Sequence, residues 1–352
     1  MSDNFLILGW YGFAHFLVDA ACAGLVYSLS IGSQFAGLNF FFLIVLYNVF
    51  AFGFQPLIGF IVDSYRLPRF SAIIGYGLIV ISLLVASLLP TLSFFLAGFG
   101  NAFFHVGGGI VSLSINPGKA TAPGLFVAPG ALGLFIGMIA GKSNTSLFYW
   151  VVLLLLAGVT TLLLPAPKTI YNYIKKVAKI RYGTIIILLL LASISVRALV
   201  GMAVFFPWKS NILLLAILTL AAGSGKGMGG IVADKLGWVK TSVGALVLSI
   251  PFLYLGAAYP LLGIAGMLLF QMTMPVTLVA LAMLLPGSPG FTFGLTTLAL
   301  LLGALPVMFA YHGFFTQPII NSLTIVGSAA ILFVSLRLFF KTAASKQLVV
   351  HE

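Results

Sequence analysis

The sequence predicts an all-helical polytopic membrane protein in which twelve transmembrane helices form two parallel six-helix halves. Two observations lead to this fold class. First, 61% of the residues are hydrophobic and only 6% are charged, whereas an average soluble protein is about 25% charged. Lipid must therefore surround most of the chain. Second, the segment Gly-Phe-Ile-Val-Asp at 59–63 recurs as Gly-Ile-Val-Ala-Asp at 230–234, displaced by 171 residues in a chain of 352. The chain is thus expected to contain two copies of one unit.

Each predicted span is an apolar run bounded by polar, proline or glycine residues. A transmembrane helix needs about 20 such apolar residues. The first half is expected to contain spans at 5–31, 38–62, 70–90, 92–115, 122–142 and 146–165. The second half is expected to contain spans at 183–206, 211–233, 240–258, 261–284, 290–312 and 316–340.

Hydrophilic residues gather in one long segment, 166–182, which contains five Lys and Arg residues. This segment predicts a cytoplasmic linker between an N-terminal half at 1–165 and a C-terminal half at 183–340. A cytoplasmic tail is expected at 341–352. The other loops are very short and leave little room for an extramembrane domain.

The basic residues predict the orientation of the chain. With the N-terminus inside, thirteen Lys and Arg residues fall on the cytoplasmic side, and only Lys142 and Lys209 fall outside. By the positive-inside rule, both termini are expected in the cytoplasm. The N-terminus lacks the basic region of a cleavable signal peptide, so the first apolar run is expected to span. We therefore expect a multi-pass protein of the cytoplasmic (inner) membrane, and the net charge of +12 needs no nucleic-acid partner.

The repeat is parallel, because six spans are an even number and both halves start on the same side. Two six-helix halves related by an axis along the membrane normal are the architecture of the major facilitator superfamily. The repeated segment resembles the loop signature of that superfamily, Gly-x-x-x-Asp-Arg/Lys-x-Gly-Arg-Arg, between spans two and three and again between spans eight and nine. The second copy matches better, because Lys235 and Gly237 follow Asp234, whereas the first copy lacks the glycine and the paired basic residues.

Four short stretches carry a more specific likeness. They are His15-x-x-x-Asp19, Gln55-Pro56-x-x-Gly59-x-x-x-Asp63-x-Tyr65-x-x-Pro68, Phe104-His105 and Leu285-Pro286-Gly287. Through them the chain resembles the fosmidomycin resistance proteins, a branch of drug exporters. That family has Pro-Glu after Phe-His and a glutamate before Leu-Leu-Pro-Gly, where this chain has Val106-Gly107 and Met283. The drug substrate of the family is therefore not carried over.

Ionisable residues inside the spans are candidates for function, because a charge within the bilayer is costly. His15 and Asp19 lie one turn apart on the same face of span one, and His105 lies in a glycine-rich part of span four. A buried carboxylate beside imidazoles can load and release a proton during a transport cycle. The three residues therefore predict a proton-coupling site. The alternative is a buried polar group that only fixes helix packing.

Two cations inside the second half are candidates for substrate binding, together with His105. Arg197, in span seven, offers a permanently charged fork for a carboxylate or phosphate. It is expected to bind an anionic substrate, to pair with Asp19, or to do both in one cycle. Lys226 lies in a Gly-Ser-Gly-Lys-Gly stretch that lacks the spacing of a phosphate-binding loop. It either lines a cationic cavity or extends to the cytoplasmic face.

The repeated segment itself predicts a pair of gates. Spans five and eleven both open on Pro-Gly, at 123–124 and 289–290, and helix N-termini stabilise a docked aspartate by about 0.3–2 kcal/mol. By resemblance to the superfamily, Asp63 and Gly59 would dock on span eleven, and Asp234 and Gly230 on span five. Breaking both contacts would open the cytoplasmic side. The alternative is that these aspartates only set topology.

The combined features predict a secondary active transporter of a small organic solute. The solute is expected to be anionic or zwitterionic, because fixed cations outnumber acids in the spans. Span five resembles the glycine- and proline-rich signature of superfamily antiporters, which favours proton-coupled export. Alternatives are facilitated or proton-coupled uptake of a metabolite, a membrane-embedded transferase, or a channel. We expect no enzymatic activity, no cofactor and no metal site, because Cys22 is the single cysteine and the chain has no acidic cluster. The expected partners are the solute, protons and the lipid bilayer, and the chain is expected to be a monomer.

Overall fold

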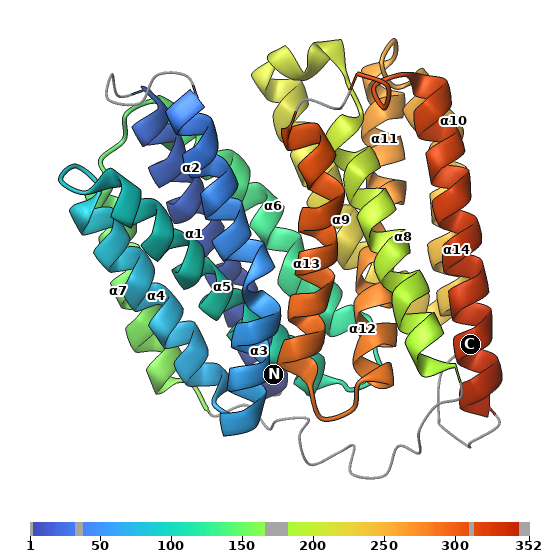
Figure 1. Cartoon of the computed structure of the whole chain (residues 1–352), viewed down its shortest axis with the longest axis horizontal. Helices are drawn as coiled ribbons and strands as arrows, with labels where there is room; N and C mark the ends of the chain where they lie inside the picture. Colours follow the sequence, from blue (N-terminus) through green and yellow to red (C-terminus); the bar gives the residue numbers. More distant parts are fainter. Residues whose placement is uncertain (1–2, 32–37, 166–181, 310–312, 345–352) are drawn as a thin grey trace. The chain divides into compact units, whose positions relative to one another are not determined.

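The computed structural model describes residues 3–31, 38–165, 182–309 and 313–344, and its regular elements in these ranges are helices (Figure 1). The first half of the sequence forms α1 (Asp3–Ile31), α2 (Leu38–Asn48), the π-helix η1 (Val49–Gly53), α3 (Gln55–Tyr65), α4 (Pro68–Val85), α5 (Pro90–Ile115), α6 (Thr121–Lys142) and α7 (Phe148–Leu163). The second half forms α8 (Gly183–Ala203), the 3-10 helix η3 (Pro207–Ser210), α9 (Ile212–Leu236), α10 (Trp238–Leu255), α11 (Pro260–Gln271), α12 (Met274–Leu284), α13 (Pro289–Met308) and α14 (Pro318–Ala344).

Length and composition suit these helices to a membrane. Among the described residues, eleven helical stretches are long and apolar enough to cross a bilayer, and α7 is a shorter apolar helix of 16 residues. The expected fold class, an all-helical polytopic protein with these spans, is confirmed. The predicted linker, except for Tyr182, and the predicted tail beyond Ala344 lie outside the described residues.

Two of the predicted spans are interrupted rather than continuous. In span two, α2 passes into the π-helix η1 before α3 begins, and the Gln55 side chain donates to the Ala51 carbonyl oxygen at 2.6 Å. In span ten, α11 ends at Gln271 and α12 begins at Met274, with Pro275 in its first turn. Proline has no backbone N–H, and a π-helix changes the pairing of backbone groups. Both interruptions therefore leave backbone polar groups inside a span that do not follow the regular α-helical pairing.

The chain divides into two compact units that exchange parts of two helices. Unit 1 comprises 1–115, 129–170 and 288–298, and unit 2 comprises 116–128, 171–287 and 299–352. The first part of α6 therefore packs in unit 2 and the rest of it in unit 1, whereas the first part of α13 packs in unit 1 and the rest in unit 2. These are the two helices that the repeated segment was expected to meet.

Small residues let helices approach closely inside each unit. In unit 1, Gly133, Gly137 and Gly141 of α6 follow α1 at helical spacing, so that an added Cβ at Gly133 would lie 2.3 Å from the Phe16 carbonyl oxygen. Reciprocal serine pairs also join helices: the hydroxyl oxygens of Ser82 and Ser93 are 3.0 Å apart, and α4 packs along α5 there. Such contacts replace the hydrophobic driving force that helices lack in lipid.

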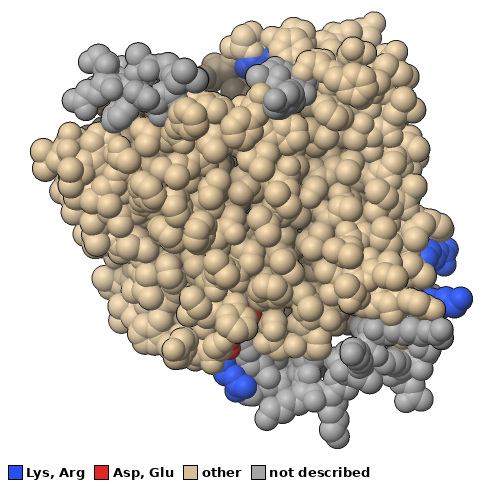
Figure 2. Space-filling view, viewed as in Figure 1, with Lys and Arg blue, Asp and Glu red and all other residues tan. Residues whose placement is uncertain are grey.

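The described surface is almost free of charge. Figure 2 shows one face on which Lys, Arg, Asp and Glu are sparse and apolar or neutral side chains fill the area between them. Large apolar side chains are exposed on many helices, including Phe60, Leu84, Leu163 and Leu261. A surface of this kind is suited to lipid rather than to water.

Candidate functional site

The first copy of the repeated segment docks on the start of α13. The Asp63 carboxylate accepts hydrogen bonds from the backbone N–H groups of Gly290, at 2.9 Å, and Phe291, at 2.8 Å. A Cβ at Gly59, one turn earlier in α3, would lie 2.2 Å from the Gly290 carbonyl oxygen. Glycine therefore permits the approach, and the aspartate satisfies N–H groups that have no partner within the helix.

The second copy makes the matching contact with the start of α6. The Asp234 carboxylate accepts from the backbone N–H groups of Ala120, at 2.9 Å, and Thr121, at 2.8 Å. It also accepts from the Thr121 hydroxyl at 2.6 Å and the Trp238 indole N–H at 3.4 Å. A Cβ at Gly230 would lie 2.3 Å from the Ala120 carbonyl oxygen. The glycine and the aspartate thus have the same two tasks in both copies.

The docking positions differ in one detail from the expected Pro-Gly openings. Helix α13 begins at Pro289 as expected, but α6 begins at Thr121, two residues before Pro123. Proline is tolerated there because the N–H groups of the first turn have no partner within the helix. Asp234 consequently contacts residues 120 and 121 rather than the Pro-Gly pair.

The turns after the two copies explain why only one contains the glycine of the superfamily signature. Gly237, which ends α9, has a φ of 96°, and the equivalent Arg66, which ends α3, has a φ of 57°. Gly237 has a ψ of 146°, a conformation with positive φ that is essentially restricted to glycine, whereas Arg66 has a ψ of 40° and lies in the αL region, which other residues can enter. Arg66 adopts that region at a cost of about 1–2 kcal/mol.

A second candidate site lies inside unit 1, where His15, Asp19 and His105 form one buried cluster. His15 Nε2 lies 3.1 Å from Asp19 Oδ2, and His105 Nε2 lies 3.6 Å from Asp19 Oδ1. The two Nε2 atoms are 2.8 Å apart. Helix α1 supplies the first two residues and α5 the third, and each is at most 7% exposed. The sequence predicted that His15 and Asp19 share one face of a helix and named His105 as a third candidate, and the structure brings all three together.

Asn101, which the sequence did not single out, orients this cluster. It precedes His105 by one turn of α5, and its backbone carbonyl oxygen lies 2.8 Å from His105 Nδ1. Its side-chain Nδ2 donates to Asp19 Oδ1 at 3.3 Å. A carbonyl oxygen can only accept, so Nδ1 carries the hydrogen and a neutral His105 presents the Nε2 lone pair to the cluster.

Gly130 of α6 closes the cluster from a third helix. A Cβ there would lie 2.5 Å from His15 Nε2 and 2.6 Å from Asp19 Oδ2. Because Gly130 has no side chain, the glycine- and proline-rich helix α6 can pass close to the ends of the His15 and Asp19 side chains. Within the described residues, this cluster is also the group of His, Cys, Asp and Glu side chains close enough to share a metal ion, with ligand atoms within 4.8 Å of one another.

In unit 2, Arg197 is a buried cation held by neutral groups. Its Nε donates to the Ser193 carbonyl oxygen and its Nη2 to the Thr277 hydroxyl, both at 3.2 Å, and its Nη1 donates to the Thr273 hydroxyl. The two threonines flank the start of α12, where span ten is interrupted. The sequence offered no signal for these threonines, because their role depends on the break.

Lys226 lies in the middle of α9, where its side chain is half-buried. Its backbone carbonyl oxygen would lie 2.7 Å from a Cβ on Gly124 of α6. The stretch around it is therefore helical and glycine-packed rather than a loop. A role for its side chain in substrate binding stays a prediction.

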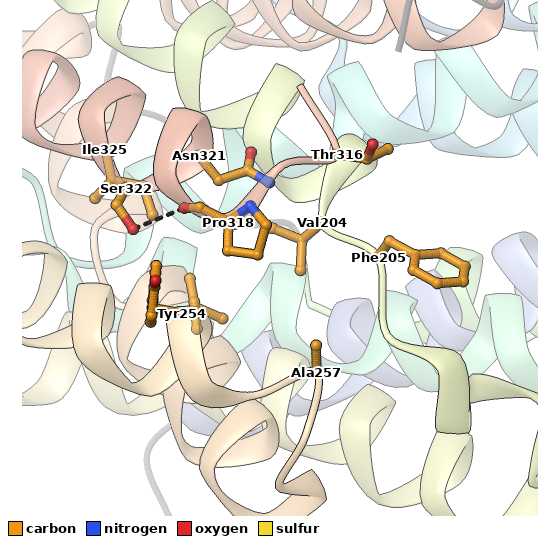
Figure 3. A pocket seen from close by; sticks show the side chains of 10 residues that line it. Val204, Phe205, Tyr254, Ala257, Thr316, Pro318, Asn321, Ser322 and Ile325 are labelled. Atoms are coloured by element: carbon orange, nitrogen blue, oxygen red, sulfur yellow. Dashed lines mark hydrogen bonds between the residues drawn. The ribbon is translucent and has the colours of Figure 1, made fainter. Parts of the chain in front are cut away.

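A small cavity lies at one end of unit 2, between the residues that follow α8 and the start of α14 (Figure 3). Its volume is about 20 Å³, which is enough for one water molecule. The Asn321 side chain borders it and has a buried Oδ1 without a hydrogen-bond partner among the described residues. The Ser322 hydroxyl donates to the Pro318 carbonyl oxygen at 2.9 Å. This cavity is too small for an organic solute.

Comparison with known proteins supports the fold but not a family assignment. No family model matches the chain, and no curated protein matches it in sequence. Solved structures do match in fold. The fucose:proton symporter FucP of E. coli is 14% identical with a TM-score of 0.69, covering 96% of this chain and 99% of that one. FucP in an outward conformation is 13% identical with a TM-score of 0.68 and the same coverage.

The human organic anion transporter MFSD10 gives a similar result, with 14% identity and a TM-score of 0.66 over 96% of this chain and 100% of that one. FucP is described as a major facilitator superfamily transporter. At these identities the likeness shows the fold alone, and the chain has the major facilitator fold, as the repeated segment predicted.

Proposed function

We propose that this chain is a secondary active transporter, which moves a small organic solute across the cytoplasmic membrane by alternating access. The observation that carries the proposal is the fold shared over 96% of the chain with a proton symporter and an organic anion transporter. The two moving bodies are the halves 1–165 and 183–340, joined by the linker at 166–182, with both termini in the cytoplasm. The protein works as a monomer, without enzymatic activity and without a nucleic-acid partner.

Proton coupling is assigned to Asp19, His15 and His105. Their buried nitrogens and oxygens lie within hydrogen-bonding or ion-pairing distance of one another, so one proton can be shared among three groups. Burial keeps water from competing for that proton. FucP is a proton symporter of the same fold, which supports a proton as the coupling ion.

Substrate binding is assigned to Arg197, with His105 and Lys226 as further contacts. A buried guanidinium whose partners are neutral retains its full charge, which favours an anionic or zwitterionic solute. MFSD10 transports organic anions, and this supports the same class of solute here.

Gating is assigned to Asp63 with Gly59 and to Asp234 with Gly230. Each aspartate bonds two N–H groups at the start of a helix from the other half of the sequence. We propose that both contacts hold the cytoplasmic side closed, in an outward conformation like the one in which FucP has been solved, and that both break in the inward-open state.

The direction we propose is export in exchange for protons, in keeping with the glycine- and proline-rich α6 and with the resemblance to the fosmidomycin resistance branch. Uptake is the second candidate, and the symporter FucP favours it.

Counterflow in proteoliposomes tests the proposed function. Vesicles loaded with an unlabelled organic anion should take up the labelled anion in exchange, because a carrier alternates between two sides. A panel of mono- and dicarboxylates, phosphonates and amino acids would identify the class. Passive flux without counterflow would indicate a channel, and a chemically altered anion would indicate an enzyme, so either result would refute the proposal.

A further inference from the structure

We infer that the cluster of His15, Asp19 and His105 binds a divalent transition metal ion of the zinc class. This inference goes beyond the proposed transport function and does not depend on it. The ion and the shared proton would compete for the same nitrogen and oxygen atoms. The sequence led us to expect no metal site, because it contains one cysteine and no acidic cluster. The structure instead gathers two imidazoles and one carboxylate from α1 and α5.

The spacing of the three groups is that of ligands around one ion. Zinc lies about 2.0–2.2 Å from its nitrogen and oxygen ligands, so tetrahedral ligand atoms lie roughly 3.3–3.5 Å apart. The two Nε2 atoms are 2.8 Å apart, Asp19 Oδ2 lies 3.1 Å from His15 Nε2, and Asp19 Oδ1 lies 3.6 Å from His105 Nε2. Each of these distances is close to that value, and the carboxylate presents a different oxygen to each histidine. An ion would require the two histidine nitrogens to separate by about half an ångström.

The orientation of His105 is that of a metal ligand. Its Nδ1 hydrogen bonds to the Asn101 carbonyl oxygen at 2.8 Å, which leaves Nε2 unprotonated in the neutral ring and directed at Asp19 and His15. Ligating histidines in metal sites characteristically donate their other ring N–H to a backbone carbonyl or carboxylate in this way.

The side chain of Asn101 offers a candidate fourth ligand. Asn101 is 2% exposed, and its Oδ1 is buried without a hydrogen-bond partner among the described residues. The Nδ2 atom of the same amide lies 3.3 Å from Asp19 Oδ1, so a rotation of the amide brings the oxygen toward the cluster. An unsatisfied buried oxygen is costly, and coordination of a cation would remove that cost.

Gly130 provides the space for the ion. A Cβ at this position would lie 2.5 Å from His15 Nε2 and 2.6 Å from Asp19 Oδ2, against the two atoms that would bind the metal. The size of the side chain at position 130 therefore determines how much space is left beside His15 Nε2 and Asp19 Oδ2.

The ligand set selects the class of ion. Imidazole nitrogens with one carboxylate suit zinc, cobalt, nickel or iron, whereas calcium and magnesium need six or more oxygen ligands. Zinc is the probe of choice because its tetrahedral preference matches four ligands, and cobalt is its spectroscopic substitute.

Zinc binding to the purified full-length chain tests the inference. The protein should carry no histidine tag and should be treated with a chelator before equilibrium dialysis against micromolar Zn²⁺. We expect one zinc per chain and visible absorption bands of tetrahedral Co²⁺ after cobalt loading. His105→Ala and Asp19→Asn should each weaken binding by about 100-fold or more, above the effect of losing an outer-shell partner.

Two glycine variants separate metal binding from folding. Gly130→Ala keeps every ligand but places a methyl group against the ends of the His15 and Asp19 side chains, which can move, so it should fold and bind zinc about 10–100-fold more weakly. Gly9→Ala on α1 is the matched control, because a Cβ there meets no atom within 4 Å. Absence of zinc from the unaltered protein, or equal zinc in all variants, would overturn the inference. Counterflow, measured separately, would still decide the proposed function.

Discussion

Arg197 shows how a charge can be kept inside a span where the described residues provide it with no acidic partner. Three neutral oxygens accept its hydrogen bonds, two of them hydroxyls one turn apart on α12 and the residue before it. The planar guanidinium reaches both hydroxyls through its two Nη atoms. A lysine ammonium is a single point of charge and would not reproduce this geometry. The guanidinium is therefore well oriented and electrically unbalanced, which is the condition for attracting an anion.

Substitution of Arg197 should weaken anion binding without weakening the fold. Charge-assisted hydrogen bonds contribute about 1.5–3 kcal/mol, so Arg197→Lys should lower the affinity for the transported anion about 10-fold and Arg197→Met about 100-fold. A thermal-shift titration in detergent measures both. The melting temperature without ligand should stay unchanged or rise, because replacing a buried charge by an apolar side chain is often neutral or stabilising.

The exposed Arg337, which stacks over Phe333 at 5.4 Å, supplies the matched control. Arg337→Met should leave the anion-dependent shift intact. If Arg197→Met keeps the same shift, Arg197 does not bind the solute.

Only some residues of the candidate sites could be predicted from the sequence. The resemblance of the repeated Gly-x-x-x-Asp to the superfamily signature implied that Asp63 and Asp234 dock at helix starts, and both hydrogen-bonded contacts are present. The sequence also placed His15 beside Asp19. It could not predict Asn101, Thr273 or the unsatisfied Asn101 oxygen, because these depend on how α5 meets α1 and on a helix break. Periodicity did not reveal that break, since the apolar run continues through it.

At the scale of elements, our proposal that the two aspartate contacts are separable latches can be tested one contact at a time. Asparagine keeps one acceptor oxygen but loses the charge, so Asp63→Asn and Asp234→Asn should each forfeit a charge-assisted bond of about 1.5–3 kcal/mol. Each variant should therefore shift the population toward the inward-open state by roughly 10-fold or more.

Maleimide labelling measures that shift, because the single native cysteine, Cys22, is fully buried. Cysteines at Ile110, beside Gly290, and at Ala122, beside the Asp234 contact, should label faster in the matching variant; both native side chains are fully buried. Asp3→Asn, at the exposed start of α1, is the control. Unchanged labelling in both aspartate variants would exclude the latch.

The contact of α6 with α1 gives a prediction in which two glycines have opposite effects. Gly133→Ala would place a Cβ 2.3 Å from a backbone oxygen of Phe16, which cannot move unless the helices separate, so it should destabilise by about 1–3 kcal/mol. Gly77→Ala on α4 meets no atom within 4 Å and should be neutral or stabilise by about 0.5–1 kcal/mol. Thermal unfolding in detergent compares the two. Equal melting temperatures would mean that α6 and α1 do not pack through Gly133.

At the scale of the whole molecule, alternating access needs two bodies and a contact that opens. The start of α13 packs within unit 1, where it meets Asp63, and the start of α6 packs within unit 2, where it meets Asp234. The repeated Gly-x-x-x-Asp is what makes both places alike. In the mechanism we propose, these two similar contacts close one side, and the His15, Asp19 and His105 cluster and Arg197 belong to different units.

The compartment in which the anion accumulates under a known proton gradient shows whether the protein exchanges the anion for protons or carries both together. Vesicles that are acidic inside should accumulate the anion if the protein exchanges it for protons, and should expel it if the protein carries both together. The sign does not depend on how the protein is oriented in the vesicle, because the gradient alone fixes the equilibrium. Export as proposed therefore predicts accumulation in the acidic compartment.

The magnitude of that accumulation gives the stoichiometry. One pH unit is worth about 1.4 kcal/mol per proton, so one proton per solute supports a limit of about 10-fold and two protons about 100-fold, with the membrane potential clamped. Asp19→Asn should abolish the gradient-driven accumulation while counterflow persists, because the cluster loses its charge but Arg197 is untouched. Accumulation in the alkaline compartment would instead establish uptake with protons, as in the symporter of the same fold. Accumulation unaffected by Asp19→Asn would remove the cluster from the coupling mechanism.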